Sequence, residues 1–112
     1  MNTEMGKTND AMVMAAVNMT ELVRGQDRAL VETMTPVVEH RSVALDLANV
    51  ERIDAAGIAA LISLYGAARD SGHGFAVANP TAHVKEILSL VGLDRILLSP
   101  HACERMTELT AA

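Results

Sequence analysis

The segment VERIDAAGIAAL, residues 50–61, is where chemistry is most expected in this sequence. An extended apolar stretch gives way to a helical pattern there, and such turns often carry a nucleophilic hydroxyl or thiol, or glycines that bind phosphate. This turn instead consists of one acid, three small residues and one aliphatic residue: Asp54, Ala55, Ala56, Gly57 and Ile58. The acid could cap the helix and the glycine could permit the bend, so a shaped turn without a nucleophile is predicted.

Other candidate catalytic or ligand-binding groups are scattered along the chain. The sequence contains neither a Walker motif nor GxGxxG, and Ser63 and Ser89 lie in helical patterns without an evident base. Asp46, within an apolar strand, is interpreted as a carboxylate that accepts backbone hydrogen bonds. Metal-ligand spacing is absent among the four histidines, which are His40, His73, His83 and His101. We therefore predict no catalytic residue, no metal site and no cofactor, and we expect protein–protein recognition.

Length and composition limit the class of protein. With 112 residues, 50% of them hydrophobic, the chain is expected to form one domain over residues 1–112. Within it, residues 1–10 are expected to form a short edge strand or to lack fixed structure. Nine scattered basic residues, a net charge of −5 and only two aromatic residues (one Phe, one Tyr) argue against nucleic-acid binding. No secretory signal or membrane-spanning run is evident, and Cys103 is alone, so a soluble cytoplasmic protein is predicted.

The first half of the chain predicts alternating strands and helices. AMVMAAVNM, residues 11–19, is expected to be a strand that forms a hairpin with an earlier edge strand. A helix is predicted from Gly25, and Pro36 should end or kink it near Thr35. SVALDLANV, residues 42–50, is apolar enough for a buried parallel strand.

The second half continues the alternation. From Gly57 an apolar stripe at helical spacing is formed by Ile58, Leu61, Ile62 and Tyr65. FAVAN, residues 75–79, predicts a strand, and a helix opening at residues 80–81 should end in a left-handed cap at Gly92. Residues 96–98 predict a last short strand, and a final helix is expected from His101.

This alternation predicts an α/β fold. Strands joined through helices pair in parallel by right-handed crossovers. We therefore expect a mixed, mostly parallel sheet with an N-terminal hairpin, packed with about four helices. Functional residues of such sheets gather where strands end and helices begin, which again indicates residues 54–58.

The motifs of the last two-thirds of the chain, in this order and spacing, resemble the STAS domain family of sulphate transporters and anti-sigma factor antagonists. An apolar strand ends in LDL and is followed by Val-x-x-Ile-Asp, two small residues and Gly, a helix, a short strand, an Asn-Pro turn and a helix ending in Gly-Leu. The matching residues are Leu45-Asp46-Leu47, Val50, Ile53-Asp54, Ala55-Ala56-Gly57, Gly74, Asn79-Pro80 and Gly92-Leu93.

The resemblance implies a cytoplasmic binding partner in a bacterial regulatory switch. In the antagonists, the position matching Ala56 is a Ser or Thr that is phosphorylated by a partner kinase, itself the anti-sigma factor. The unphosphorylated antagonist binds that kinase and releases the sigma factor. This sequence departs from the pattern, because Ala56 cannot accept a phosphate and no Ser, Thr or Tyr occurs between Val43 and Ile62. Val23 also replaces the Asp of an upstream Gly-x-Leu-Asp motif.

Two functions fit these features. The first is an antagonist-like regulator that binds an anti-sigma factor or a related serine kinase/ATPase through Asp54–Ile58 and is not phosphorylated at this turn. The second is the STAS subunit of a bacterial ABC transporter that moves lipid, where the domain would clamp the ATPase without inserting into the membrane. Self-association as a homodimer through exposed apolar residues of the helix after Gly57 is left open.

Overall fold

The computed structural model describes residues 12–98, which form two parallel β-sheets and four helices. The larger sheet has the strand order β1-β3-β5, from β1 (Val13–Ala16), β3 (Val43–Asp46) and β5 (Phe75–Ala78). The smaller sheet pairs β2 (Glu21–Leu22) with β4 (Arg52–Ile53). The predicted α/β class with parallel pairing is confirmed.

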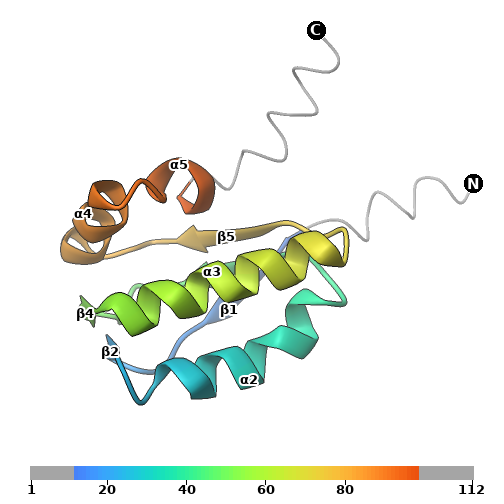
Figure 1. The fold of residues 1–112 in the computed structure, drawn as a ribbon, viewed down its shortest axis with the longest axis horizontal. Coiled ribbons are helices and arrows are strands. Elements are labelled where there is room, and N and C mark those ends of the chain that lie inside the picture. Colours follow the sequence, from blue (N-terminus) through green and yellow to red (C-terminus); the bar gives the residue numbers. More distant parts are fainter. Residues whose placement is uncertain (1–11, 99–112) are drawn as a thin grey trace, which may run out of the picture.

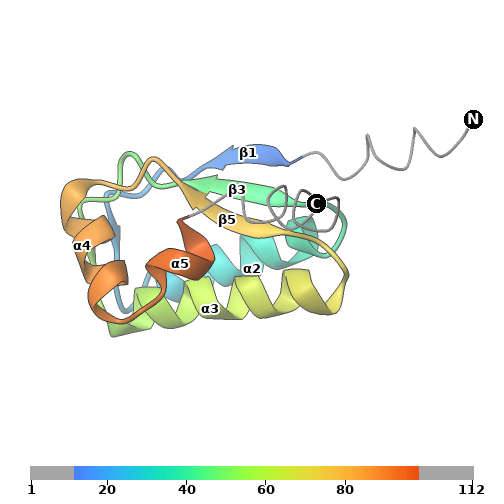
Figure 2. The same ribbon diagram turned by 90° about the horizontal axis from the view of Figure 1, so that it is seen from above.

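The helices are α2 (Asp27–Val38), α3 (Ala55–Asp70), α4 (Ala82–Leu90) and α5 (Asp94–Leu97). The two longer helices, α2 and α3, lie side by side along one face of the larger sheet (Figure 1, Figure 2). The shorter α4 and α5 lie toward the β5 side of the fold (Figure 2). The described part of the chain therefore has a sheet layer and a helix layer.

The core between these layers is aliphatic. Parallel pairing places Val43 opposite Phe75 and Leu45 opposite Val77, and all four side chains are buried. Helix α2 contributes Leu30, Met34 and Val38, which are four residues apart and share one face of the helix. Buried residues from other elements complete the core, namely Leu22, Leu47, Val50, Leu61, Leu64, Val84, Leu88 and Leu97.

Both ends of the predicted fold lie outside the described residues. The first strand of the expected hairpin falls within residues 1–10, and the expected final helix begins at His101. The second strand of that hairpin, β1, is present and pairs in parallel with β3, with Val13 opposite Val43.

Helix α2 continues beyond the proline that was expected to interrupt it. Pro36 lies inside the helix, which ends at Val38, so the prediction that the helix could end near Thr35 was wrong. A proline removes one backbone donor, and its ring crowds the carbonyl four residues earlier. Here Glu32, whose carbonyl loses that donor, is exposed to solvent, and the hydroxyl of Thr35 donates to the carbonyl of Val31 at 2.6 Å. Burial of Val38 holds the last turn in place.

The predicted strand at residues 96–98 was also wrong, because Ile96 and Leu97 belong to the helical turn α5 and Leu98 is its C-cap. The amide of Leu97 donates to the carbonyl of Leu93 at 2.8 Å, and Leu97 is buried. Residues four apart share a helix face, so this turn directs both leucines toward the core. The left-handed cap expected at Gly92 is confirmed, with φ +81° and a bond from the amide of Leu93 to the carbonyl of Leu88.

The apolar stripe predicted on α3 overlaps the buried face without matching it, because Leu61 is buried and Ile58 and Tyr65 are half-buried against the core while Ile62 is exposed. Helix α3 buries Gly57, Ala60, Leu61, Leu64 and Ala68, whereas Ile62 is 48% exposed. Because this helix is apolar on nearly every side, spacing alone could not identify the face that meets the sheet.

Candidate protein-binding site

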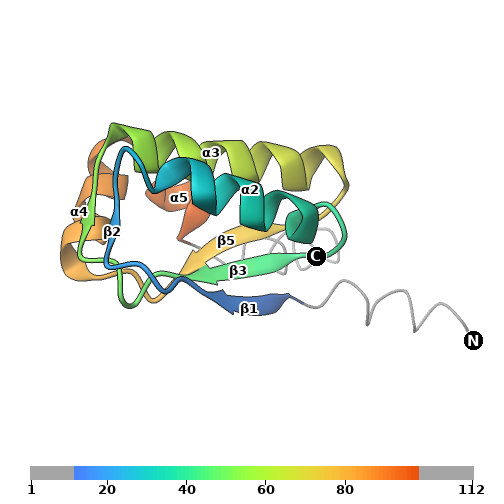
Figure 3. The same ribbon diagram turned by 90° about the horizontal axis from the view of Figure 1, so that it is seen from below.

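The turn at residues 54–58 is positioned by the β2–β4 pair. Strand β4 ends at Ile53 opposite Leu22, and the amide of Asp54 donates to the carbonyl of Leu22 at 3.3 Å. Helix α3 begins at the next residue, Ala55. In Figure 3 the pair lies at the N-terminal ends of α2 and α3. The turn therefore follows directly from a paired strand.

Asp54 caps α3, as predicted. Its extended backbone (φ −123°, ψ −170°) directs the side chain back onto the first turn of the helix, where Oδ1 accepts the amides of Ala56 at 3.0 Å and Gly57 at 3.1 Å. These are two of the four amides that an isolated helix leaves unpaired. The cap fixes the first turn in one conformation.

The second carboxylate oxygen of Asp54 reaches a segment thirty residues earlier. Oδ2 accepts the amide of Arg24 at 3.1 Å. Arg24 occupies a β-turn in which the amide of Gln26 donates to the carbonyl of Val23 at 2.9 Å and Gly25 has φ +108°. Asp54 thereby holds the β2–α2 loop against the start of α3.

These bonds also set the ionisation of Asp54. The amides of Arg24 and Gly57 lower the pKa of the carboxyl below its usual value, burial partly opposes them, and the amide of Ala56 and the charge of Arg24 lower the pKa further. Asp54 is therefore a carboxylate near neutral pH, with its oxygens engaged by backbone donors.

Position 57 must be glycine because the backbone of strand β2 lies too close for a side chain. A Cβ atom at this position would overlap the carbonyl oxygen of Leu22 and would lie 2.8 Å from Cγ1 of Ile53. Gly57 is buried. Its absent side chain lets α3 begin directly against strand β2.

The remaining positions of the turn form its outer surface. Ala55 is exposed, and Ala56 and Ile58 are half-buried. A shallow open hollow is lined by Arg24, Asp54, Ala55 and Ala56, none of which carries a hydroxyl group. The structure thus adds Arg24 to the five residues expected from the sequence. The one sequence signal for it was the Arg-Gly turn that follows the short strand β2.

Three of the other candidate groups, Asp46, His40 and His73, have structural partners. Oδ1 of Asp46 accepts the amide of Ala48 at 2.9 Å, which confirms its interpretation as an acceptor of backbone hydrogen bonds. The ring Nδ1 atoms of His40 and His73 lie 2.7 Å and 3.1 Å from the carbonyl oxygens of Pro36 and Val38. His101 and Cys103 lie outside the described residues. Within residues 12–98, no three His, Cys, Asp or Glu side chains are grouped as metal ligands.

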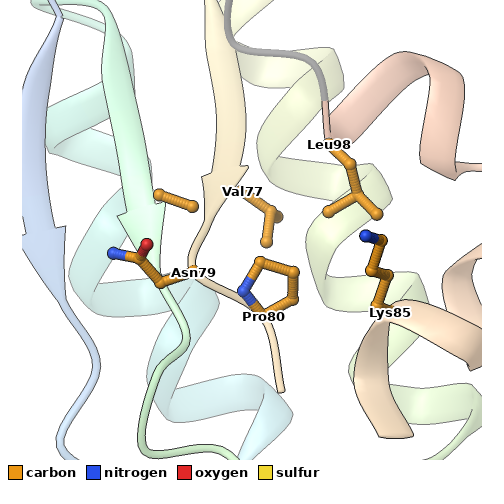
Figure 4. Close-up of a pocket in the computed structure, with 6 residues that line it drawn as sticks. Val77, Asn79, Pro80, Lys85 and Leu98 are labelled. Carbon is orange, nitrogen blue, oxygen red and sulfur yellow. The ribbon is translucent and has the colours of Figure 1, made fainter. Parts of the chain in front are cut away.

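A second pocket of about 310 Å³ lies at the carboxyl end of β5 (Figure 4). It is lined by Val77, Ala78, Asn79, Pro80, Lys85 and Leu98. Lys85 extends from α4 toward Leu98 and is the single ionisable residue of this lining. One cation beside an amide side chain and apolar groups does not supply an acid and base pair for proton transfer.

The helices of the described segment are too short or too polar to cross a membrane.

Comparison with known proteins identifies a family and a solved structure that this chain resembles. A family model described as "Mlab, STAS domain" matches residues 11–99. The crystal structure of a proposed anti-sigma factor antagonist from Thermotoga maritima has the same fold, with a TM-score of 0.66 and 23% sequence identity over 78% of this chain and 80% of that chain. No curated protein matches the sequence. The family match spans most of the chain, and the chain therefore belongs to the STAS domain family.

Proposed function

We propose that this chain is a non-catalytic regulatory domain that binds an anti-sigma factor, or a related serine kinase or ATPase, through the turn Asp54–Ile58. The observation that carries the proposal is the construction of the turn. Asp54 ties together three backbone amides from two segments, and this fixes a surface that carries the exposed methyl of Ala55 and the half-buried methyl of Ala56. A rigid surface of small side chains costs little entropy on binding and lets a partner backbone approach closely.

The same turn lacks the chemistry of a phosphorylation switch. A phosphate would bring about −1.5 to −2 charges to such a contact and would repel a partner that had buried it. The lining of the hollow offers no hydroxyl, and the sequence offers none between Val43 and Ile62. We infer that binding is not switched off by phosphorylation at this turn. Control would then come from the amount of the protein or from a tethering protein.

The second candidate is a STAS subunit that clamps the ATPase of a bacterial ABC lipid transporter. The missing hydroxyl favours it as much as the first, because a permanent subunit needs no switch. The two candidates use the same kind of contact and differ in the identity of the ATPase. The surrounding genes provide an early indication, since a sigma factor or a histidine-kinase-like ATPase nearby supports the first and lipid-transporter genes support the second.

Affinity capture from the source organism tests the proposal directly. The baits are the wild-type chain, Ala56→Asp and the matched control Ala82→Asp. Both alanines lie in the first turn of a helix, where an added acid is tolerated by the helix dipole. We expect mass spectrometry to show an anti-sigma factor or serine-kinase-type ATPase with the wild-type and Ala82→Asp baits, and at least tenfold less of it with Ala56→Asp, because the new acid would be desolvated in the contact.

Two results would contradict the proposal. Capture of a transporter ATPase as the main partner would support the second candidate. Equal recovery of the partner by all three baits would place the contact away from the turn.

A further inference from the structure

The solvent face of α3 carries no charge over most of its length. The helix has 16 residues, and its sequence from Ala55 to Ala68 contains no acidic or basic side chain. Helices at a protein surface usually present charged and polar residues to water. On α3 the exposed positions in this stretch are instead Ala55, Ala59, Ile62 and Ser63.

These exposed positions form a continuous stripe. Ala59 and Ile62 follow Ala55 by four and seven residues, so the three side chains lie on one side of the helix. At 1.5 Å per residue the stripe extends about 10 Å from the turn. Ile62, at 48% exposure, is its one large apolar side chain.

A basic residue lies at the start of this stripe. Arg24 lines the same hollow as Ala55, and its side chain is exposed. Within residues 12–98 no carboxylate oxygen lies within 4 Å of its guanidinium, and the ion pair found in this part of the chain joins Glu21 and Arg52. The neighbouring carboxylates are already engaged by backbone amides, Asp54 by three and Asp27 by the amide of Gly25 at 3.0 Å. These hydrogen bonds hold both carboxylates in place without neutralising them, and the exposed guanidinium of Arg24 remains a cationic group at this end of α3 that can pair with a carboxylate of a partner, although the chain as a whole has a net charge of −5.

We propose that the partner presents a carboxylate to Arg24 and, beside it, an aliphatic side chain that packs on the stripe formed by Ala55, Ala59 and Ile62. This inference rests on the proposed function and specifies the chemistry of the partner. Charge complementarity fixes the orientation of the partner on the turn, and burial of Ile62 supplies apolar area. The alanines give the partner room to approach the helix backbone.

Titration of the purified partner, taken as the protein most depleted from the Ala56→Asp bait, tests the two contacts separately. Arg24→Glu is compared with Arg41→Glu, an exposed arginine beyond the opposite end of α2, so both variants change the net charge equally. Ile62→Ala is compared with Leu90→Ala, whose side chain is 75% exposed on α4. All four positions are exposed, and a melting curve for each variant verifies folding.

We expect Arg24→Glu to raise Kd at least tenfold and Ile62→Ala about fivefold, with changes below twofold for both controls. Arg24→Gln should also reduce the dependence of Kd on salt concentration, because the contact that it removes is ionic.

Three outcomes would contradict the inference, and they separate its failure from failure of the proposed function. If Arg24→Glu and Ile62→Ala bind as their controls do while Ala56→Asp is weak, the turn is the site but this extension is wrong. If Arg24→Glu binds more tightly than the wild-type chain, the partner is basic and the assigned charge is wrong. If no captured protein distinguishes Ala56→Asp from the wild-type bait, the proposed function itself fails together with this inference.

Discussion

Replacement of Gly57 by alanine sets helix propensity against close packing at the start of α3. In an open helix, Gly→Ala stabilises by about 1 kcal/mol, because alanine has less backbone entropy to lose. At Gly57 the new Cβ would overlap the carbonyl oxygen of Leu22 and lie 2.8 Å from Cγ1 of Ile53. Leu22 is fully buried and paired with β4, so its backbone cannot move away without disturbing that pair.

The steric cost should exceed the gain in propensity. Overpacking a core costs about 1–3 kcal/mol, and contact with a fixed backbone atom places this case at the upper end. Displacing Leu22 would also weaken the bond from the amide of Asp54 to its carbonyl, worth about 1 kcal/mol. With about 1 kcal/mol of propensity subtracted, we expect a net loss of about 3 kcal/mol in the free energy of unfolding. For a chain of this size the melting temperature should fall by roughly 10 °C or more.

Gly66 provides the matched control within the same helix. A Cβ at Gly66 would have no heavy atom within 4 Å. Gly66→Ala should therefore raise stability by about 0.5–1 kcal/mol. Urea unfolding followed by circular dichroism measures both variants. If Gly57→Ala proved as stable as Gly66→Ala, the close approach of α3 to β2, and with it the construction of the turn, would be refuted.

Three further predictions concern α2, the cap and the missing switch. Pro36→Ala should stabilise the last turn of α2 by about 1 kcal/mol in urea unfolding, because it restores a backbone donor at an exposed position; unchanged or lower stability would contradict this. Asp54→Asn should make the melting temperature depend less on pH in acidic solution. The folded-state pKa of Asp54 is lowered, so its contribution to the stability of the fold is complete above the ordinary value of 3.8 and is lost as pH falls through the folded value. Melting temperatures measured from pH 6 to roughly pH 2 would contradict this if those of the variant fell with pH as steeply as those of the wild type. After incubation with a cognate serine kinase, mass spectrometry should find residues 50–61 unmodified, and a phosphopeptide there would defeat the inference.

Features governed by neighbouring residues could be predicted from the sequence. The Asp54 cap depends on an acid placed just before an apolar helix, and the cap at Gly92 depends on a glycine after the last helical residue. The strand from Val43 was evident because a short apolar run ends at a turn. Each of these signals lies within a few residues of the structure that it specifies.

Features governed by distant contacts could not be predicted in this way. Three consecutive aliphatic residues at positions 96–98 fit a strand or a helix equally, and the burial of Leu97 decides between them. Helix α2 continues past Pro36 because Val38 packs into the core. Arg24 joins the turn through a hydrogen bond to a residue thirty positions away, which local pattern does not show.

Amide chemical-shift mapping tests directly whether the turn that begins α3 is a docking surface. The isotope-labelled chain would be titrated with the purified partner and the perturbed amides assigned. We predict the largest changes at Arg24 and across Asp54–Ile58, with smaller changes extending along α3 toward Ile62. Changes confined to the apolar corner between α4 and α5, at Leu90–Ile96, with an unperturbed turn would contradict it.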